Sequence, residues 1–212
     1  MTRLALLLLA VLALTACGGK KDSTATIGVD PCHQIKTPDP VTRHVSKPTL
    51  TLDPKKTYDV TLVTNCGSIT IRLDVKDAPK TTASFVSLVR RHFFIHTIFH
   101  RIIPGFVIQG GDPTGSGNGG PGYETVEAPP QSTKYKEGVV AMAKTAAEAS
   151  GTAGSQFFIV IGPDAASLPP DYALLGEVKD GLDVAKTIGT YGDSQGSISR
   201  LIEIEKATVD VH

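Results

Sequence analysis

The chain has 212 residues, of which 41% are hydrophobic, enough for one sizeable domain and an additional segment. Lys and Arg total 21, Asp and Glu also total 21, and only 6% of the residues are aromatic. A neutral chain without a long basic run lacks the charge pattern of nucleic-acid-binding proteins, and one long apolar segment is too few for a multi-span membrane protein. We expect a protein that binds no nucleic acid, and we expect it to be monomeric.

Residues 1–16 have the features of an export signal. Arg3 supplies a positive charge, and residues 4–14 form an apolar run that is too short to cross a bilayer as a helix. The tetrapeptide LTAC, which ends at Cys17, resembles the lipobox of bacterial lipoproteins, in which the cysteine is acylated and becomes the mature N-terminus. The resemblance implies an exported chain that a lipid on Cys17 anchors to the bacterial cell membrane, facing outside the cytoplasm. The alternative is an ordinary secretory signal with a chance cysteine.

Residues 17–57 are predicted to be a lipidated N-terminus and flexible tether. They are rich in Gly, Lys, Thr and Pro and show no sustained apolar periodicity. Such a segment lifts a domain off a membrane surface and builds no core of its own.

The remaining cysteines suggest a disulfide. If Cys17 is acylated, Cys32 and Cys66 are the only thiols left. Exported chains fold in an oxidising compartment, where two such cysteines often pair, and a Cys32–Cys66 bond would join the tether to the domain. The alternative is two free thiols. One cysteine pair is too few for a zinc site unless histidines join it.

From residue 58 onward the sequence mostly predicts β-strands. Apolar and polar residues alternate over 58–64 and 68–74, so that Ile69, Ile71 and Leu73 share one face. Further apolar strands are expected at residues 102–109, 138–143, 156–161, 172–178 and 199–209.

Two helices are expected among these strands. Within residues 78–93, Pro79 suits a first helical turn, Phe85 and Leu88 lie at helical spacing, and the helix is expected to end near Arg91. A shorter helix is expected at 181–189. Many strands with only two helices indicate a closed β-barrel capped by helices.

Several long motifs occur in the order found in one enzyme family. FHRIIPGFVIQGGD, which begins at Phe99, is followed by a Gly-rich loop, by VVAMA and by GSQFFIV. Together with APKTTASFVSLV and LLGEVKDGLDV, these motifs resemble the cyclophilin family of peptidyl-prolyl cis-trans isomerases. The resemblance implies that residues 58–212 form a mainly β domain, a closed eight-stranded antiparallel β-barrel capped by two α-helices. This agrees with the strands and helices expected from periodicity.

The resemblance also accounts for an arginine in an apolar stretch. Rotation about an X–Pro bond must cross a barrier of roughly 18–20 kcal/mol, because twisting removes the amide resonance. The twisted prolyl nitrogen accepts a hydrogen bond, so a guanidinium beside it stabilises the transition state more than either planar ground state. The resemblance assigns this catalytic role to Arg101. Neither a cofactor nor a metal is required.

The resemblance implies a substrate groove around Arg101. Proline-containing polypeptides would be the substrates, and the binding residues would be His100, Phe106, Val107, Gln109, Ala143, Lys144, Gln156, Phe158, Leu168 and Tyr172. The alternative for the phenylalanines is core packing, which we favour for Phe157. The alternative for Arg101 is a surface salt bridge.

The sequence departs from the family pattern at several positions, of which Lys144 and Tyr172 leave two functional classes open. Val107 stands where Met is usual, Lys144 stands where many members have Asn, and Tyr172 replaces a His. The first class is a membrane-tethered isomerase that assists the folding of exported or cell-surface proteins. The second is a non-catalytic module that binds proline-containing peptides. We favour the enzyme, because a simple proline pocket would not need Arg101.

Three other patterns in the sequence do not indicate a metal or ligand site. His92, His96 and His100 lie four residues apart, but the helix is expected to end before them, so we expect no metal there. Residues 115–120 match GxGxxG formally, yet no helix follows, so we interpret them as a loop flanking the groove. Residues 144–155 have a helix-forming composition but lie where the family has a loop, so a helix and a loop are both possible for this segment.

Overall fold

The computed structural model describes residues 30–212 of the chain. The predicted signal segment 1–16 and the predicted lipidation site Cys17 lie outside this range. Among residues 30–212, no helix is both long enough and apolar enough to cross a membrane.

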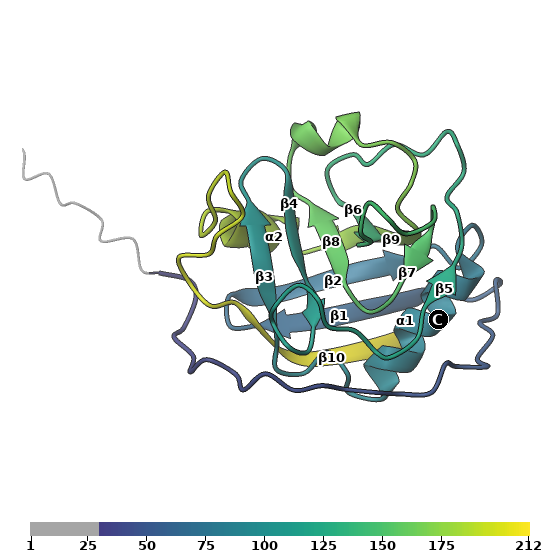
Figure 1. Cartoon of the computed structure of the whole chain (residues 1–212), viewed down its shortest axis with the longest axis horizontal. Coiled ribbons are helices and arrows are strands. Elements are labelled where there is room, and N and C mark those ends of the chain that lie inside the picture. Colours follow the sequence, from purple (N-terminus) through teal and green to yellow (C-terminus); the bar gives the residue numbers. More distant parts are fainter. Residues whose placement is uncertain (1–29) are drawn as a thin grey trace, which may run out of the picture.

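Eight strands close into an antiparallel barrel, as the sequence predicted, in the order β1-β10-β3-β4-β8-β6-β9-β2 (Figure 1). The barrel strands are β1 (Tyr58–Thr64), β2 (Gly67–Leu73), β3 (Thr97–Ile103), β4 (Val107–Asp112), β6 (Val139–Met142), β8 (Phe157–Val160), β9 (Leu174–Asp180) and β10 (Glu203–Val211). Two further strands, β5 (Thr125–Val126) and β7 (Thr152–Ala153), pair with each other outside the barrel.

The two predicted helices are present on opposite sides of the barrel (Figure 1). Helix α1 spans Pro79–Arg90 and begins at its proline, whose fixed φ suits a first helical turn. It ends at Arg90 and does not extend to residue 93, because His92 takes the left-handed conformation with φ 57°. Helix α2 spans Leu182–Gly189, and a short 3₁₀ helix, η1, spans Pro163–Ser167. No helix forms over 144–155.

The side chains of β8 serve two separate cores. Phe157 points into the barrel, where its ring packs edge-on against Phe85 with 5.5 Å between centroids. Phe158 belongs to a second apolar cluster with Val107 and Tyr135. Neighbouring strand residues point to opposite faces, so one strand supplies both the barrel interior and an outer apolar surface.

Residues 30–57, which we call the N-terminal strap, lie along the outside of the barrel rather than apart from it (Figure 1). They contain no helix or strand, as expected of a tether. However, the Val41 N–H donates to the Pro113 carbonyl at 3.0 Å and the Val45 N–H to the Pro121 carbonyl at 2.9 Å. Leu52 is buried in the core. The strap therefore docks because its backbone groups find partners on loops that are distant in sequence.

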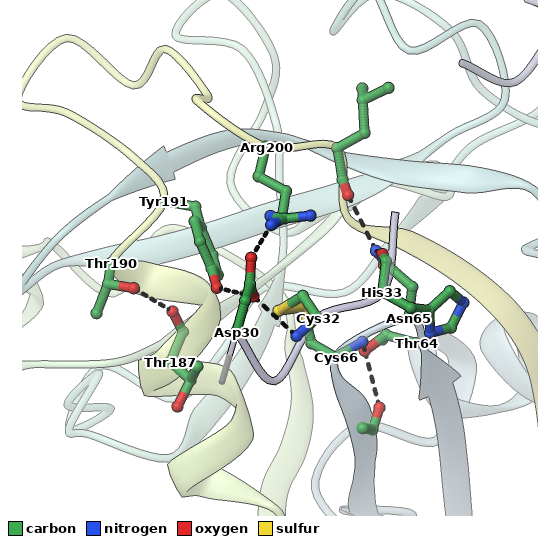
Figure 2. Close-up of a disulfide and its surroundings, with 12 residues drawn as sticks. Asp30, Cys32, His33, Thr64, Asn65, Cys66, Thr187, Thr190, Tyr191 and Arg200 are labelled. Carbon is green, nitrogen blue, oxygen red and sulfur yellow. Dashed lines mark hydrogen bonds and ion pairs between the residues drawn. A yellow bond between two sulfur atoms is a disulfide. The ribbon is translucent and has the colours of Figure 1, made fainter. Parts of the chain in front are cut away.

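The predicted disulfide joins the strap to the domain. Cys32 is bonded to Cys66, which lies in the turn between β1 and β2 (Figure 2). Both cysteines are buried. The neighbouring Asn65 donates from its side-chain amide to the carbonyl of His33 at 2.8 Å, so that hydrogen bonds support the covalent link.

Candidate active site

A pocket of about 400 Å³ lies on the outer apolar surface beside β3, β4 and β8. It gathers all the residues predicted to contact substrate except His100 and Gln156. Its lining residues are Arg101, Phe106, Val107, Gln109, Ala143, Lys144, Phe158, Leu168 and Tyr172.

The floor of the pocket is apolar and rigidly packed. Val107 and Phe158 are only 2% and 4% exposed, because the second apolar cluster lies directly beneath them. The Phe158 ring meets the Tyr172 ring edge-on at 5.4 Å between centroids, and Leu168 packs on the same cluster. A proline ring is small and apolar, so this floor suits it without placing a polar group in contact with it.

A β-bulge in β3 places Arg101 on the pocket side. Phe99 pairs with Gly110 and Arg101 pairs with Gln109, so His100 is an extra residue without a partner on β4. Strict alternation would send Arg101 inward with Phe99. The extra residue instead leaves Arg101 on the outer face and puts Ile102 in the core, where it is fully buried.

The Arg101 guanidinium is half-buried and forms no ion pair with any residue of the described range 30–212. Its Nη1 donates to Oε1 of Gln109 at 3.4 Å, and its central carbon lies 5.9 Å from the ring centroid of Phe106. No carboxylate within residues 30–212 pairs with it, so the structure does not support the surface salt-bridge alternative. A guanidinium has five N–H donors, and most of those on Arg101 remain available to a substrate.

A chain of side-chain amides connects Arg101 to the Gly-rich loop. Nε2 of Gln109 donates to Oε1 of Gln156 at 3.1 Å. Nε2 of Gln156 in turn donates to the carbonyls of Gly117 and Gly119, at 2.9 and 3.0 Å. Gln156 therefore lies one hydrogen bond away from the pocket and orients Gln109.

A second hollow of about 570 Å³ adjoins the pocket. It shares Gln109, Ala143 and Lys144 with the pocket, and Gln156 lines it. The Gly-rich loop and the carboxylate-bearing residues Glu124 and Glu148 complete its wall. Because they share Gln109, Ala143 and Lys144, the two hollows form one continuous groove.

The structure places His100 beneath the Gly-rich loop, against Gly117, rather than in the pocket lining. Its Nδ1 is buried and has no hydrogen-bond partner in the part of the chain that the structure describes. Burial is the main cause that lowers the pKa of His100, against the opposing effect of the Asp112 carboxylate. The imidazole is therefore neutral at physiological pH.

Asp112, which the sequence analysis missed, shapes the Gly-rich loop. Its carboxylate accepts hydrogen bonds from the N–H groups of Thr114, Gly117 and Gly119, at 2.7, 2.6 and 3.1 Å. Burial raises the pKa of Asp112, but these hydrogen bonds outweigh burial and lower it overall. The available signal was an Asp at the start of a Gly- and Ser-rich stretch, since such carboxylates commonly cap backbone turns.

Lys144 supports the groove wall rather than offering its charge to a peptide. Its Nζ pairs with Oδ2 of Asp171 at 2.6 Å and donates to the carbonyls of Thr145 and Glu148 at 3.2 Å. It also lies 5.7 Å from the ring centroid of Tyr172. The side chain is only 4% exposed, so its ammonium group is occupied by these contacts.

Tyr135 is a second residue that the sequence analysis missed. Its hydroxyl donates to the Tyr172 carbonyl at 2.7 Å and accepts from the Tyr172 N–H at 2.9 Å. Burial raises the pKa of Tyr135 to about 12, so the hydroxyl stays protonated. Tyr135 thus fixes the backbone of Tyr172 from below. The only sequence signal for Tyr135 was an aromatic residue within a polar stretch.

The site contains the groups for non-covalent catalysis. Among residues 30–212, no cluster of three His, Cys, Asp or Glu side chains is arranged to hold a metal ion. The pocket instead combines an apolar floor with one cationic donor. This arrangement can bind a proline ring and offer a hydrogen bond to the nitrogen of a twisting amide.

Comparisons with known proteins agree with this geometry. A relative from Gibberella zeae, named Peptidyl-prolyl cis-trans isomerase-like 1, is 38% identical over 152 residues, covering 69% of this chain and 90% of the relative. Peptidyl-prolyl cis-trans isomerase A of Mycobacterium tuberculosis is 41% identical over 147 residues, covering 62% of this chain and 79% of the relative.

Solved structures agree as well. A cyclophilin type peptidyl-prolyl cis-trans isomerase of Cryptosporidium parvum superposes with a TM-score of 0.64 at 33% identity, covering 73% of this chain and 98% of the other. The same enzyme, solved in the presence of the dipeptide Ala-Pro, superposes with a TM-score of 0.63. Residues 59–209 match the family model described as "Cyclophilin type peptidyl-prolyl cis-trans isomerase/CLD", and with the barrel, pocket and relatives in agreement, the chain belongs to the cyclophilin-type peptidyl-prolyl cis-trans isomerases.

Proposed function

We propose that this isomerase acts on X–Pro bonds of exported or cell-surface polypeptides and assists their folding. A lipid on Cys17 would hold it on the bacterial cell membrane, facing outside the cytoplasm. Two observations support this location: the lipobox-like sequence that ends at Cys17, and the buried Cys32–Cys66 bond. Structural disulfides form and persist mainly in oxidising compartments.

The observation that carries the chemistry is the unpaired Arg101 guanidinium above the apolar floor. In the planar ground states the prolyl nitrogen lends its lone pair to the amide and accepts no hydrogen bond. As the bond twists, the nitrogen becomes pyramidal and the Arg101 N–H groups can donate to it. Every ~1.4 kcal/mol of such selective stabilisation accelerates isomerisation tenfold.

Exchange of an Ala-Pro peptide, followed by NMR with the full chain, tests this role. We expect Arg101→Ala to lower kcat/KM about 100-fold, the usual effect of removing one preorganised donor. The matched control is Arg90→Ala, because Arg90 is an exposed arginine of α1 outside the pocket. Retained activity in folded Arg101→Ala would exclude this residue as the donor. An inactive, well-folded wild type would instead indicate a peptide-binding module.

The location is tested in the bacterial host with an alkyne-tagged palmitate. We expect the tag on the wild-type chain and none on Cys17→Ser. A membrane-impermeant biotinylating reagent should also label the wild-type chain in intact cells. Equal tagging of both chains, or no labelling of intact cells, would contradict the proposed anchor and orientation.

A further inference from the structure

A loop between α2 and β10, residues 191–200, supports Arg101 from behind; we call it the supporting loop. Barrel strand β10 pairs with β3 only at its first two residues, Glu203 and Ile204. Further along β3, the Ile102 N–H donates instead to the carbonyl of Gly196 at 3.2 Å. The supporting loop therefore replaces β10 as the neighbour of β3 where β3 carries Arg101.

The main chain of Gly196 lies against the side chain of Arg101. A β-carbon at position 196 would stand 2.9 Å from Cγ and 3.4 Å from Nε of Arg101, and the backbone there has φ 86°. Only glycine fits both the conformation and the space. Any displacement of this loop changes the surface on which the Arg101 stem rests.

Hydrogen bonds within the loop shape its tip, and the bond from the Ile102 N–H to the Gly196 carbonyl joins the tip to the barrel. The Asp193 carboxylate accepts from the N–H groups of Gln195 and Ser197, both at 2.9 Å. The Gly196 N–H donates to the Asp193 carbonyl at 3.0 Å. The position of the tip depends on the Ile102–Gly196 bond and also on how the two ends of the loop, Tyr191 and Arg200, are held.

Asp30 of the strap bridges these two ends (Figure 2). The Tyr191 hydroxyl donates to Oδ1 of Asp30 at 2.6 Å, and the Arg200 guanidinium forms an ion pair with Oδ2. The same guanidinium lies 5.5 Å from the ring centroid of Tyr191. One carboxylate thus contacts both ends of the loop, in addition to the hydrogen bonds that the Ser199 N–H and hydroxyl donate to the Tyr191 carbonyl. Asp30 comes from outside residues 59–209, the range of the family match.

The disulfide holds Asp30 in place. The Cys32 N–H donates to Oδ1 of Asp30 at 3.0 Å, and Cys32 itself is bonded to Cys66. The side-chain amide of Asn65 reaches both sides, donating to His33 at 2.8 Å and to the Leu201 carbonyl at 3.1 Å. Without the covalent bond, the start of the strap would be more mobile, and each contact of Asp30 with the loop would cost more conformational entropy.

We propose that Asp30 is a positioning residue for Arg101, acting through the supporting loop and held there by the Cys32–Cys66 disulfide. This inference rests on the catalytic role proposed for Arg101. Because Asp30 touches neither substrate nor Arg101, its loss should affect the orientation of the donor and spare the apolar floor. The expected signature is therefore a lower kcat with a nearly unchanged KM.

The test compares Asp30→Asn with Asp39→Asn in the full chain, using the Ala-Pro peptide. Asp39 is an exposed aspartate of the same strap without a side-chain hydrogen bond among residues 30–212. We expect Asp30→Asn to lower kcat about three- to tenfold, in line with the loss of one charge-assisted hydrogen bond, and KM to change less than about twofold. Asp30→Glu, which keeps the charge, should recover most of kcat.

Amide hydrogen exchange supplies a readout that a general loss of stability would not reproduce. The Ile102 amide, bonded to Gly196, should exchange about tenfold faster in Asp30→Asn, while amides of β1 and β2 keep their rates. The double variant Cys32→Ala, Cys66→Ala should change kcat and the Ile102 rate in the same direction. Unchanged kcat and Ile102 exchange in Asp30→Asn, or equal acceleration throughout the barrel, would overturn the proposal. An unaffected double variant would overturn the role of the disulfide.

Wild-type turnover separates the two proposals. If the isomerase assignment fails, the wild type is inactive and no variant can be ranked. If only the positioning role fails, the wild type is active and Asp30→Asn matches Asp39→Asn.

Discussion

One wall of the pocket consists of barrel strands and the other of loops, and different interactions hold each. In the strand wall, Gln109 of β4 pairs with Arg101 on one side and with Phe158 on the other, so backbone pairing sets three site residues in register. In the loop wall, Tyr172 is placed by the Tyr135 hydroxyl and by packing on Phe158.

The difference lies in how far each wall depends on particular side chains. Backbone pairing does not depend on side-chain identity. The strand wall should therefore keep Arg101 and Gln109 in position when neighbouring side chains change. The loop wall depends on a few specific side chains. Two of its departures, Lys144 and Tyr172, are coupled, since Lys144 pairs with Asp171 and lies beside the Tyr172 ring. The effects of substitutions at Lys144 and Tyr172 should therefore not be additive.

The largest effect is expected from the strand wall. Phe158→Ala removes the floor of the pocket and an aromatic ring that is 4% exposed. The free energy of unfolding should fall by about 3–5 kcal/mol, and KM for the Ala-Pro peptide should rise about tenfold. Urea denaturation and NMR exchange measure the two quantities. Phe157→Leu, inside the barrel, should lower stability and leave KM unchanged. An equal KM in Phe158→Ala and wild type would show that Phe158 is not the floor.

A smaller effect is expected beneath the loop wall. Tyr135→Phe leaves the N–H and carbonyl of the half-buried Tyr172 without their partner, which should lower the free energy of unfolding by about 1–3 kcal/mol. Because the Tyr172 backbone loses its support, kcat/KM should also fall about threefold. Tyr58→Phe is the control, since its hydroxyl accepts from the Asp53 N–H outside the pocket. Equal kcat/KM in both variants would mean that Tyr135 serves stability alone.

The smallest effect is expected at the loop wall itself. Lys144→Met keeps the stem that lines the groove but removes the ion pair with Asp171. KM should rise about two- to threefold with kcat unchanged, because such partly exposed pairs contribute about 1 kcal/mol or less. Lys136→Met, at an exposed lysine, should leave both constants unaltered. If KM stays at the wild-type value in Lys144→Met, the ion pair does not hold the wall.

Several site features could be predicted and others could not, for physical reasons. Gln109 and Phe158 each belong to a contiguous motif, and the family resemblance of these motifs predicted their place in the site. Alternation separated Phe158 from the buried Phe157. Asp112 and Tyr135 act through hydrogen bonds to backbone groups that the chain brings together only after folding. Residues 17–57 were expected to be a flexible tether, because they lack apolar periodicity. The contacts of the strap include backbone hydrogen bonds to the loops at Pro113 and Pro121 and a buried Leu52, which no local pattern reveals.

The amino-acid sequence by itself determined the barrel and the kind of chemistry. Alternation in β1 and β2, helical spacing in α1 and the motif around Arg101 are local patterns, and burial of apolar side chains acts on them directly. Only the tertiary structure decided which face Arg101 occupies. Local alternation alone would bury it, and the extra residue His100 appears only when β3 pairs with β4. The register and its bulges depend on both paired strands, so they cannot be predicted from the sequence of one strand alone.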